Sequence, residues 1–294
     1  MCGVVLLSIG DQVRSGAYEV HSRFQRVVNF VGRGELISLV SEEVGAGPLN
    51  VVIGGPGCEE VIRSASKLRI DAEEVLVGDR RFSLSNVERY RSELVFGDWD
   101  KSRLLRNLAL FEELLVKDAA ATSMAFLLEE RIPGRCESAM ESALRDRMRR
   151  GVQEVFEGDL LEGIELLKGC GWGLTPSGDD FIAGLLVGME LLQKLYEVDF
   201  SRTMDAVYEA ALGENLLSNR LLALARRGLL FEKLKKLVEV LVQGETEEVA
   251  AASREVFAVG ASSGADLSTG FLMMVREQEA RFSRWSWRAV AQGA

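Results

Sequence analysis

Short apolar runs, separated by polar and glycine-containing turns, dominate the first hundred residues of the chain. They occupy residues 3–10, 26–32, 35–41, 49–55, 73–79 and 80–86. Their β-branched content, their length and their regular spacing predict the strands of a compact sheet or small barrel. Only residues 57–68 (GCEEVIRSASKL) interrupt this pattern, with a turn of helix.

The pattern changes near Asp98, after which apolar residues recur every three or four positions, as they do along a helix that buries one face. The expected helices cover residues 104–130, 136–158, 159–169, 181–196, 202–212, 214–228, 231–244, 246–260 and 267–282. We therefore expect an α+β protein, with an N-terminal β-rich sheet or small barrel at 1–100 and a larger all-helical domain at 101–294.

Composition narrows the classes of partner. The apolar fraction is 47% and the net charge is −10. An acidic surface disfavours nucleic acid and anionic membranes as partners, because both attract basic surfaces. The apolar run Gly3 to Ile9 has no basic residues before it and is too short to span a bilayer. These features lead us to expect a cytoplasmic protein.

The residue types available limit the chemistry. Four scattered cysteines without a C-x-x-C pair indicate reduced thiols, and neither a disulfide framework nor a zinc site. His21 is the single histidine, which leaves little room for a Ser-His-Asp triad or a multi-histidine metal site. We expect His21 to be structural or solvent-facing, and catalysis to rely on carboxylates, hydroxyls, backbone amides or a bound cation.

One stretch, GCGWGLTPSGDDFIAG at 169–184, combines glycines, a proline and adjacent aspartates before an apolar helical run. Ser177 and Asp180 fit a capping box, with Ser177 as the N-cap. Gly178 and Asp179 are not needed for capping. Open amides at a helix start bind anions, and adjacent carboxylates suit a hard cation, so Asp179 and Asp180 are candidate ligands of Mg²⁺.

A second stretch, ASSGADLSTG at 261–270, repeats the pattern S-G-x-D-x-x-x-G. We infer that the two helix starts converge on one site, which binds a small anionic ligand. The candidate catalytic residues are Asp179, Asp180 and Asp266, and the candidate substrate-binding residues are Thr175, Ser177, Gly178, Ser262, Ser263 and Gly264. The alternative is two well-capped core helices without a ligand.

The run GxGxGLTPSGDDFIAG, followed by ENLLSNRLLALARRG and GASSGADLSTG, resembles the AllH-type subunit of oxamate carbamoyltransferase. A looser likeness extends to RVVNFVGRGELISLV, GPLNVVI and RRFSLSNVERYRSEL in the N-terminal half. The family motif falls on residues 174–180, and its later element falls on Ser262, Ser263, Gly264 and Asp266. The family often has a histidine before that serine pair, where this chain has Ala261.

The resemblance implies phosphate-dependent carbamoyl transfer in anaerobic allantoin breakdown, in which oxalurate and phosphate give oxamate and carbamoyl phosphate. It also implies unlike partner subunits, although a homo-oligomer remains an alternative. A second hypothesis is a non-catalytic subunit that binds a phosphate-containing small molecule or nucleotide and regulates its partners. No cofactor follows with certainty from the sequence, and Mg²⁺ is the one option that the aspartates suggest.

Overall fold

The computed structural model describes residues 3–128 and 138–291, with side chains in the last helix as far as Glu279. Within these ranges the chain forms two compact units, which are described separately. The first comprises Met1–Leu94 together with Leu229–Lys235, and the second comprises Val95–Gly228 and Lys236–Ala294. The domain boundary at residue 100 stays a prediction.

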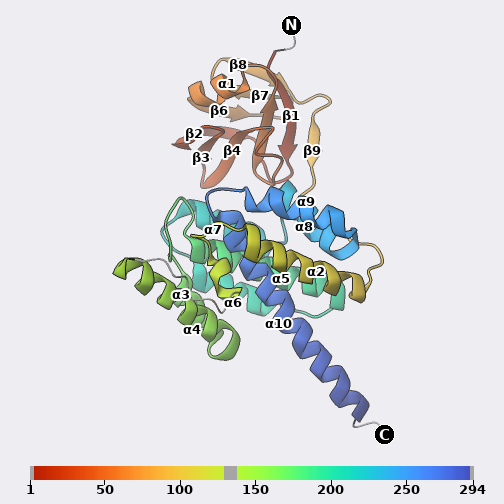
Figure 1. Cartoon of the computed structure of the whole chain (residues 1–294). Coiled ribbons are helices and arrows are strands. Elements are labelled where there is room, and N and C mark those ends of the chain that lie inside the picture. Colours follow the sequence, from red (N-terminus) through yellow and green to blue (C-terminus); the bar gives the residue numbers. More distant parts are fainter. Residues whose placement is uncertain (1–2, 129–137, 292–294) are drawn as a thin grey trace. The chain divides into compact units, whose positions relative to one another are not determined.

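The first unit is a curled sheet of nine strands and one short helix (Figure 1). The strand order is β8-β7-β6-β2-β3-β4-β5-β1-β9. Neighbours are antiparallel except for β4 with β5 and β1 with β9. The bounds are β1 Val5–Gly10, β2 Gly16–Arg23, β3 Val27–Gly32, β4 Glu35–Ser41, β5 Asn50–Gly54, α1 Cys58–Ser64, β6 Lys67–Ile70, β7 Glu74–Val77, β8 Arg80–Ser83 and β9 Glu88–Tyr90.

Alternation along the strands fills one apolar core in this unit. Phe30 of β3, Leu39 of β4 and Ile53 of β5 are fully buried in it, and Ile62 of α1 packs against them. The hairpin between β3 and β4 turns through Arg33 and Gly34, both at positive φ. A two-residue turn of this kind matches the strand twist and favours glycine. The N-terminal β-rich sheet expected from the sequence is therefore confirmed.

The segment Leu229–Lys235 belongs to this unit although it lies far along the chain. The Leu230 amide donates to the Ser92 carbonyl at 2.9 Å, and the Tyr90 hydroxyl donates to the Leu230 carbonyl at 2.9 Å. The Glu232 amide donates to the Ala46 carbonyl, and its carboxylate accepts from the Ala46 amide. The helical pattern of this segment gives no sign of these pairings.

The second unit is helical, as expected (Figure 1). Its elements are α2 Lys101–Asp118, the 3₁₀ helix η1 Met124–Leu128, α3 Ala139–Glu157, α4 Leu160–Leu167, α5 Ser177–Tyr196, α6 Ser201–Ala211, α7 Leu216–Arg226, α8 Glu232–Gln243, α9 Thr246–Phe257 and α10 Ser263–Ala291. Helix α8 begins in the segment that groups with the first unit.

The expected continuous helix over 104–130 is wrong in its C-terminal part. Helix α2 ends at Asp118, because Ala119 is extended, and η1 follows after a turn. The turn places the Met124 amide 2.5 Å from Asp266 Oδ1, a tertiary contact that outweighs helical propensity. The last part of the expected helix falls within residues 129–137, outside the described ranges.

Helix α5 is the buried centre of the helical unit, and α10 packs along it (Figure 1). Its residues are apolar on nearly every side, which is typical of a helix surrounded by others. Where the two helices cross, a Cβ on Gly184 would lie 2.0 Å from the Leu267 carbonyl oxygen. A Cβ on Gly270 would lie 2.1 Å from the Phe181 carbonyl oxygen. Glycines on both helices therefore permit close backbone contact.

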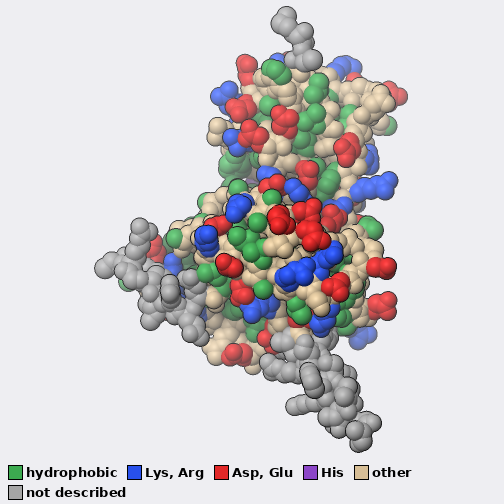
Figure 2. All heavy atoms as spheres, turned by 45° about the vertical axis from the view of Figure 1, so that its right-hand side comes forward, with side chains coloured by type: hydrophobic (Ala, Val, Ile, Leu, Met, Phe, Trp, Pro, Cys, Tyr) green, Lys and Arg blue, Asp and Glu red, His purple; other side chains and the backbone are tan. Residues whose placement is uncertain are grey.

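The surface of the molecule carries charges of both signs. On the face in Figure 2, Asp and Glu side chains are interspersed with Lys and Arg, and no continuous basic surface is visible among the described residues. None of the helices within the described residues is both long and apolar enough to cross a membrane.

Candidate site at the starts of helices α5 and α10

The two motif-bearing helix starts meet in the folded chain. Thr175 Oγ1, just before α5, donates to Asp180 Oδ2 at 2.9 Å and lies 3.2 Å from the Ser263 hydroxyl at the start of α10. Asp180 and Asp266 are buried, with exposed fractions of 1% and 0%. The expected convergence of the two helix starts is therefore confirmed as geometry.

Neither helix begins with the expected capping box. Helix α5 starts at Ser177, its N-cap is Pro176, and no side chain caps it. The backbone of a residue before a proline is held extended. From this position the Thr175 hydroxyl reaches the Asp180 side chain in the first turn of α5. Helix α10 likewise starts at Ser263. The serines are thus first helical residues, one position later than a capping box requires.

The motif glycines serve packing, and their amides are occupied. The Gly178 amide donates to the Cys170 carbonyl at 2.8 Å, and the Gly264 amide donates to the Val259 carbonyl at 3.0 Å. A Cβ at Gly178 would lie 1.9 Å from the carbonyl oxygen of Leu167. The expectation that these amides are open to an anion is therefore wrong.

The Asp179 side chain bonds to the glycine loop that precedes α5. Its Oδ1 accepts from the Gly169 amide at 2.8 Å. That loop needs glycine, because Gly169, Gly171 and Gly173 have φ values of 68°, 118° and 116°. Asp179 is thus placed as a structural anchor for the glycine loop.

Burial dominates the electrostatics of the other two aspartates. It raises the pKa of Asp180 well above its ordinary value, and the charges of Asp266 and Asp179 raise it further. Hydrogen bonds from Ser263 and Thr175 oppose this shift. A carboxyl group in such surroundings retains its proton at higher pH than a surface aspartate does.

Asp266 is also buried, but one of its two carboxylate oxygens lacks a hydrogen bond of ordinary geometry within the described residues. Burial raises the pKa of Asp266 to about 6. The Met124 amide and the hydroxyls of Ser177 and Ser262 oppose this shift, because they lower the pKa. Oδ1 accepts the hydrogen bond from Met124. Oδ2 is buried and makes no hydrogen bond of ordinary geometry within the described residues.

The described residues do not form a metal centre of the usual kind. Among them, no group of three or more His, Cys, Asp or Glu side chains is arranged to hold a metal ion. Asp179 and Asp180, the candidate Mg²⁺ ligands, contact Gly169 and Thr175. The geometry thus lends no support to a Mg²⁺ site at this pair.

Two residues near the site were not predicted from the sequence. Asn215 caps α7 by accepting from the amides of Leu217 and Ser218, and its Nδ2 donates to the Leu174 carbonyl at 2.6 Å. Its place directly before an apolar helical run was a usable N-cap signal. Met124 reaches Asp266 through its backbone amide, so no side-chain pattern indicates it.

The glycine loop exposes apolar side chains beside this site. Trp172 is 62% exposed and Leu174 is 50% exposed. A separate pocket of about 670 Å³ lies between α2, η1, α3 and α10, and its lining includes Arg149 and Arg276. None of the motif residues lines that pocket.

His21 and the cysteines lie outside the candidate site. His21 is exposed on β2 and contacts only the neighbouring Ser22 hydroxyl among the hydrogen bonds found for it, which confirms that it faces solvent. Cys58 and Cys170 are free thiols, as expected, and Cys2 and Cys136 are outside the described residues.

Comparison with protein families gives a match within each of the two units. Residues 4–89 match the AllH family N-terminal domain, and residues 167–275 match the oxamate carbamoyltransferase subunit AllH. The second match includes both S-G-x-D helix starts. No curated protein and no solved structure matches the chain. Because the two matches cover most of its length, the chain belongs to the AllH family of oxamate carbamoyltransferase subunits.

Proposed function

We propose that the chain works as a subunit in phosphate-dependent carbamoyl transfer, converting oxalurate and phosphate to oxamate and carbamoyl phosphate. The family to which it belongs supports the general activity. The observation that carries the proposal is the pair of buried aspartates, Asp180 and Asp266, at the meeting point of two family motifs. A cytoplasmic location is part of the same proposal.

The reaction needs an oriented carbamoyl group and one proton transfer. An oxygen of hydrogen phosphate attacks the ureido carbon, and the bond from that carbon to the oxamate nitrogen breaks. That nitrogen gains the proton that the phosphate loses. Burial raises the pKa of Asp180 well above its ordinary value, so its carboxyl group can carry and relay a proton at a higher pH than a surface aspartate can.

Substrate phosphate needs positive groups that the two helix starts do not supply. Neither motif contains Lys, Arg or His, and the Gly178 and Gly264 amides are occupied. Within this proposal, unlike partner subunits complete the site and bring the cationic groups. The exposed Trp172 and Leu174 lie on the loop beside the aspartates, where a partner subunit would contact the chain.

The direct test is an activity assay on the assembled protein. The chain is purified with co-expressed subunits encoded beside its gene, and carbamoyl phosphate formation from oxalurate and phosphate is measured. Asp180→Asn and Asp266→Asn are each expected to lower the rate by about a hundredfold or more, as loss of a proton-transferring group does. Asp205→Asn, which removes a part-exposed partner of Arg226, is the matched control and is expected to keep full activity.

Unfolding curves must accompany the rates. A variant that loses activity while keeping its unfolding midpoint has lost chemistry or binding, whereas a parallel loss of both indicates a structural role. Full activity in folded Asp180→Asn and Asp266→Asn assemblies would reject the site.

One observation favours a second candidate function, a non-catalytic ligand-binding subunit that regulates its partners through a phosphate-containing small molecule or nucleotide. Most polar groups of the motifs already bond within the chain, and none is a strong nucleophile. For such a subunit, Asp266→Asn would change ligand binding or regulation while the partner subunits kept their maximal rate.

A further inference from the structure

The starts of α5 and α10 are built alike, beyond their shared sequence pattern. Each helix begins at the serine of S-G-x-D, and the glycine amide of each donates back to the connection that precedes it. A Cβ on either glycine would lie 1.9 Å from the carbonyl oxygen of a residue in the preceding helix, Leu167 of α4 or Val256 of α9. The glycines one turn after each aspartate, Gly184 and Gly270, contact the opposite helix reciprocally.

The polar contacts between the two starts are also reciprocal. The Ser263 hydroxyl of α10 lowers the pKa of Asp180 of α5, and the Ser177 hydroxyl of α5 lowers the pKa of Asp266 of α10 in the same way. Each aspartate therefore meets the first serine of the other helix. This crosswise arrangement relates the two helix starts by an approximate two-fold symmetry.

One position breaks the symmetry. Thr175, two residues before the start of α5, donates its hydroxyl to Asp180 Oδ2 at 2.9 Å. The equivalent position before α10 is Ala261, which has no hydroxyl to donate. Asp266 Oδ2 makes no hydrogen bond of ordinary geometry within the described residues, and the exposed fraction of Asp266 is 0%. A buried carboxylate oxygen in this condition costs free energy.

We infer that Asp266 Oδ2 accepts a hydrogen bond from the primary amide of a small ligand, in the space that the missing Ala261 hydroxyl would fill. This inference rests on the proposed function, and it divides the roles within that site. Asp266 binds the amide end of the ligand, whereas Asp180, already paired with Thr175, keeps the proton-transfer role proposed above. We place the ligand on the side of Ala261 and Ser262, because Ala261 is exposed and Ser262 is half-buried.

The charge of the site selects the class of ligand. Asp266 lies beside Asp180, so an anionic group placed against Oδ2 would be repelled, and a neutral N–H donor is the complementary group. A carbamoyl or oxamate NH2 fits, with the carboxylate or phosphate end pointing away from the two aspartates. The assignment thus fixes the orientation of the carbamoyl group: nitrogen toward Asp266 and the anionic end toward a partner subunit.

The test uses two matched variants, one that adds a hydroxyl beside Asp266 and one that removes the hydroxyl beside Asp180. Ala261→Thr supplies the hydroxyl that Asp266 lacks, and Thr175→Ala removes the one that Asp180 has. The probes are oxamate and oxalate, which differ only in an amide against a carboxylate group. Binding is measured by the shift in unfolding midpoint and by calorimetry, on the full chain with any subunits that co-purify.

Oxamate is expected to raise the midpoint of the unmodified chain, and oxalate is not. Ala261→Thr should raise the midpoint without ligand and weaken oxamate binding by roughly tenfold to a hundredfold, which corresponds to one hydrogen bond to a charged group. Thr175→Ala should lower the midpoint and still bind oxamate. Asp266→Asn, which turns an acceptor into a donor at similar size, should lose oxamate binding while remaining folded.

Three results would overturn the inference: no oxamate binding by the unmodified chain, equal binding of oxalate and oxamate, or full oxamate binding by Ala261→Thr or Asp266→Asn. Its failure can be separated from failure of the proposed function. If the binding pattern holds but the assembly makes no carbamoyl phosphate, only the function is wrong. If the assembly makes carbamoyl phosphate and Ala261→Thr does so at the full rate, only the inference is wrong.

Discussion

At the scale of single residues, the account depends on two buried aspartates that have different hydrogen-bond partners. Asp180 Oδ2 accepts from the Thr175 hydroxyl. Asp266 Oδ1 accepts from the Met124 amide, whereas its Oδ2 makes no hydrogen bond of ordinary geometry within the described residues. The sequence revealed the aspartates and the serines, because both lie in a repeated pattern. It could not reveal that Asp179 turns to the Gly169 amide, because adjacent side chains on a helix start point in directions that only the surrounding loop decides.

Protonation of Asp266 should make stability depend on pH. Its pKa is 3.8 ordinarily and about 6 in the folded chain, so the folded state binds its proton more tightly than the unfolded state. The stabilisation is fully present below pH 3.8 and is lost as pH rises through 6, at about 1.4 kcal/mol per pH unit between these values. We expect roughly 3 kcal/mol in all.

The measurement is the free energy of unfolding of the unmodified chain and of Asp266→Asn, by urea titration from pH 4 to pH 7. The difference between the two proteins should shrink toward higher pH, because the asparagine variant lacks this proton equilibrium. A difference that stays constant over the range would contradict the raised pKa.

At the scale of elements, the crossing of α5 and α10 depends on glycine. Gly184→Ala places a methyl group 2.0 Å from the Leu267 carbonyl oxygen, a backbone atom that cannot move alone. We expect a loss of about 3 kcal/mol in unfolding free energy, as overpacking typically causes. Gly188→Ala meets only the Met274 side chain and the Phe271 carbonyl at larger distances, and should cost less.

Gly213→Ala is the control, because nothing lies within 4 Å of a Cβ built there. It is expected to leave the midpoint of urea unfolding almost unchanged. If Gly184→Ala proved as harmless as this control, the close packing of α5 against α10 would be wrong.

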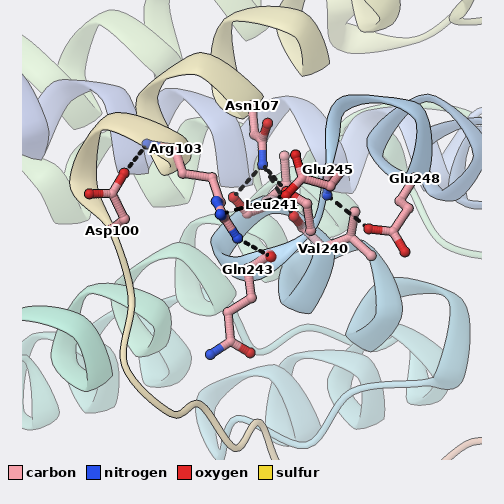
Figure 3. A network of polar contacts seen from close by, with 9 residues as sticks. Asp100, Arg103, Asn107, Val240, Leu241, Gln243, Glu245 and Glu248 are labelled. Atoms are coloured by element: carbon pink, nitrogen blue, oxygen red, sulfur yellow. Dashed lines mark hydrogen bonds and ion pairs between the residues drawn. The ribbon is translucent and has the colours of Figure 1, made fainter.

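A second element-scale feature joins the end of α8 to α2 (Figure 3). Asn107 is buried, and its Nδ2 lies 3.0 to 3.3 Å from the carbonyl oxygens of Val240, Leu241 and Gly244. These carbonyls belong to the last turn of α8 and the residue beyond it, where few helical amides are available as donors. The Val240 carbonyl also accepts from the Gly244 amide at 2.8 Å. The Arg103 guanidinium adds a bond to the Gln243 carbonyl at 2.7 Å.

Asn107→Ala removes the donor that the three carbonyls share, and only the Val240 carbonyl keeps another partner, the Gly244 amide. The expected loss is about 2 kcal/mol in unfolding free energy. Arg106→Ala, an exposed position on the same helix, serves as the control and should stay within about 0.5 kcal/mol. Chemical denaturation of both variants would check the prediction, and equal stabilities would contradict it.

At the scale of the whole molecule, periodicity in the sequence predicted the succession of a β-rich part and a helical part. It missed β6 and β9, which are short. It indicated β2 only weakly, as a stretch of mixed strand-like character. It also missed that Leu229–Lys235 joins the first unit. That grouping depends on long-range backbone pairs such as Leu230 with Ser92, and these leave no trace in local periodicity.

Part of the candidate site could be predicted from the sequence. A repeated S-G-x-D pattern indicated two equivalent helix starts, and their convergence followed from that equivalence. The role of the helix-start glycines Gly178 and Gly264 was predicted wrongly, because a sequence cannot show whether a helix-start amide is free or donates to a distant carbonyl. Gly178 and Cys170 provide the example.

The measurement that tests the central claim most directly is carbamoyl phosphate formation by the assembled protein carrying Asp266→Asn, beside the unmodified protein and Asp205→Asn. All three should unfold at similar temperatures. The account predicts that the unmodified protein and Asp205→Asn convert oxalurate and phosphate at equal rates, and that Asp266→Asn is at least about a hundredfold slower. Equal rates for all three folded proteins would contradict it.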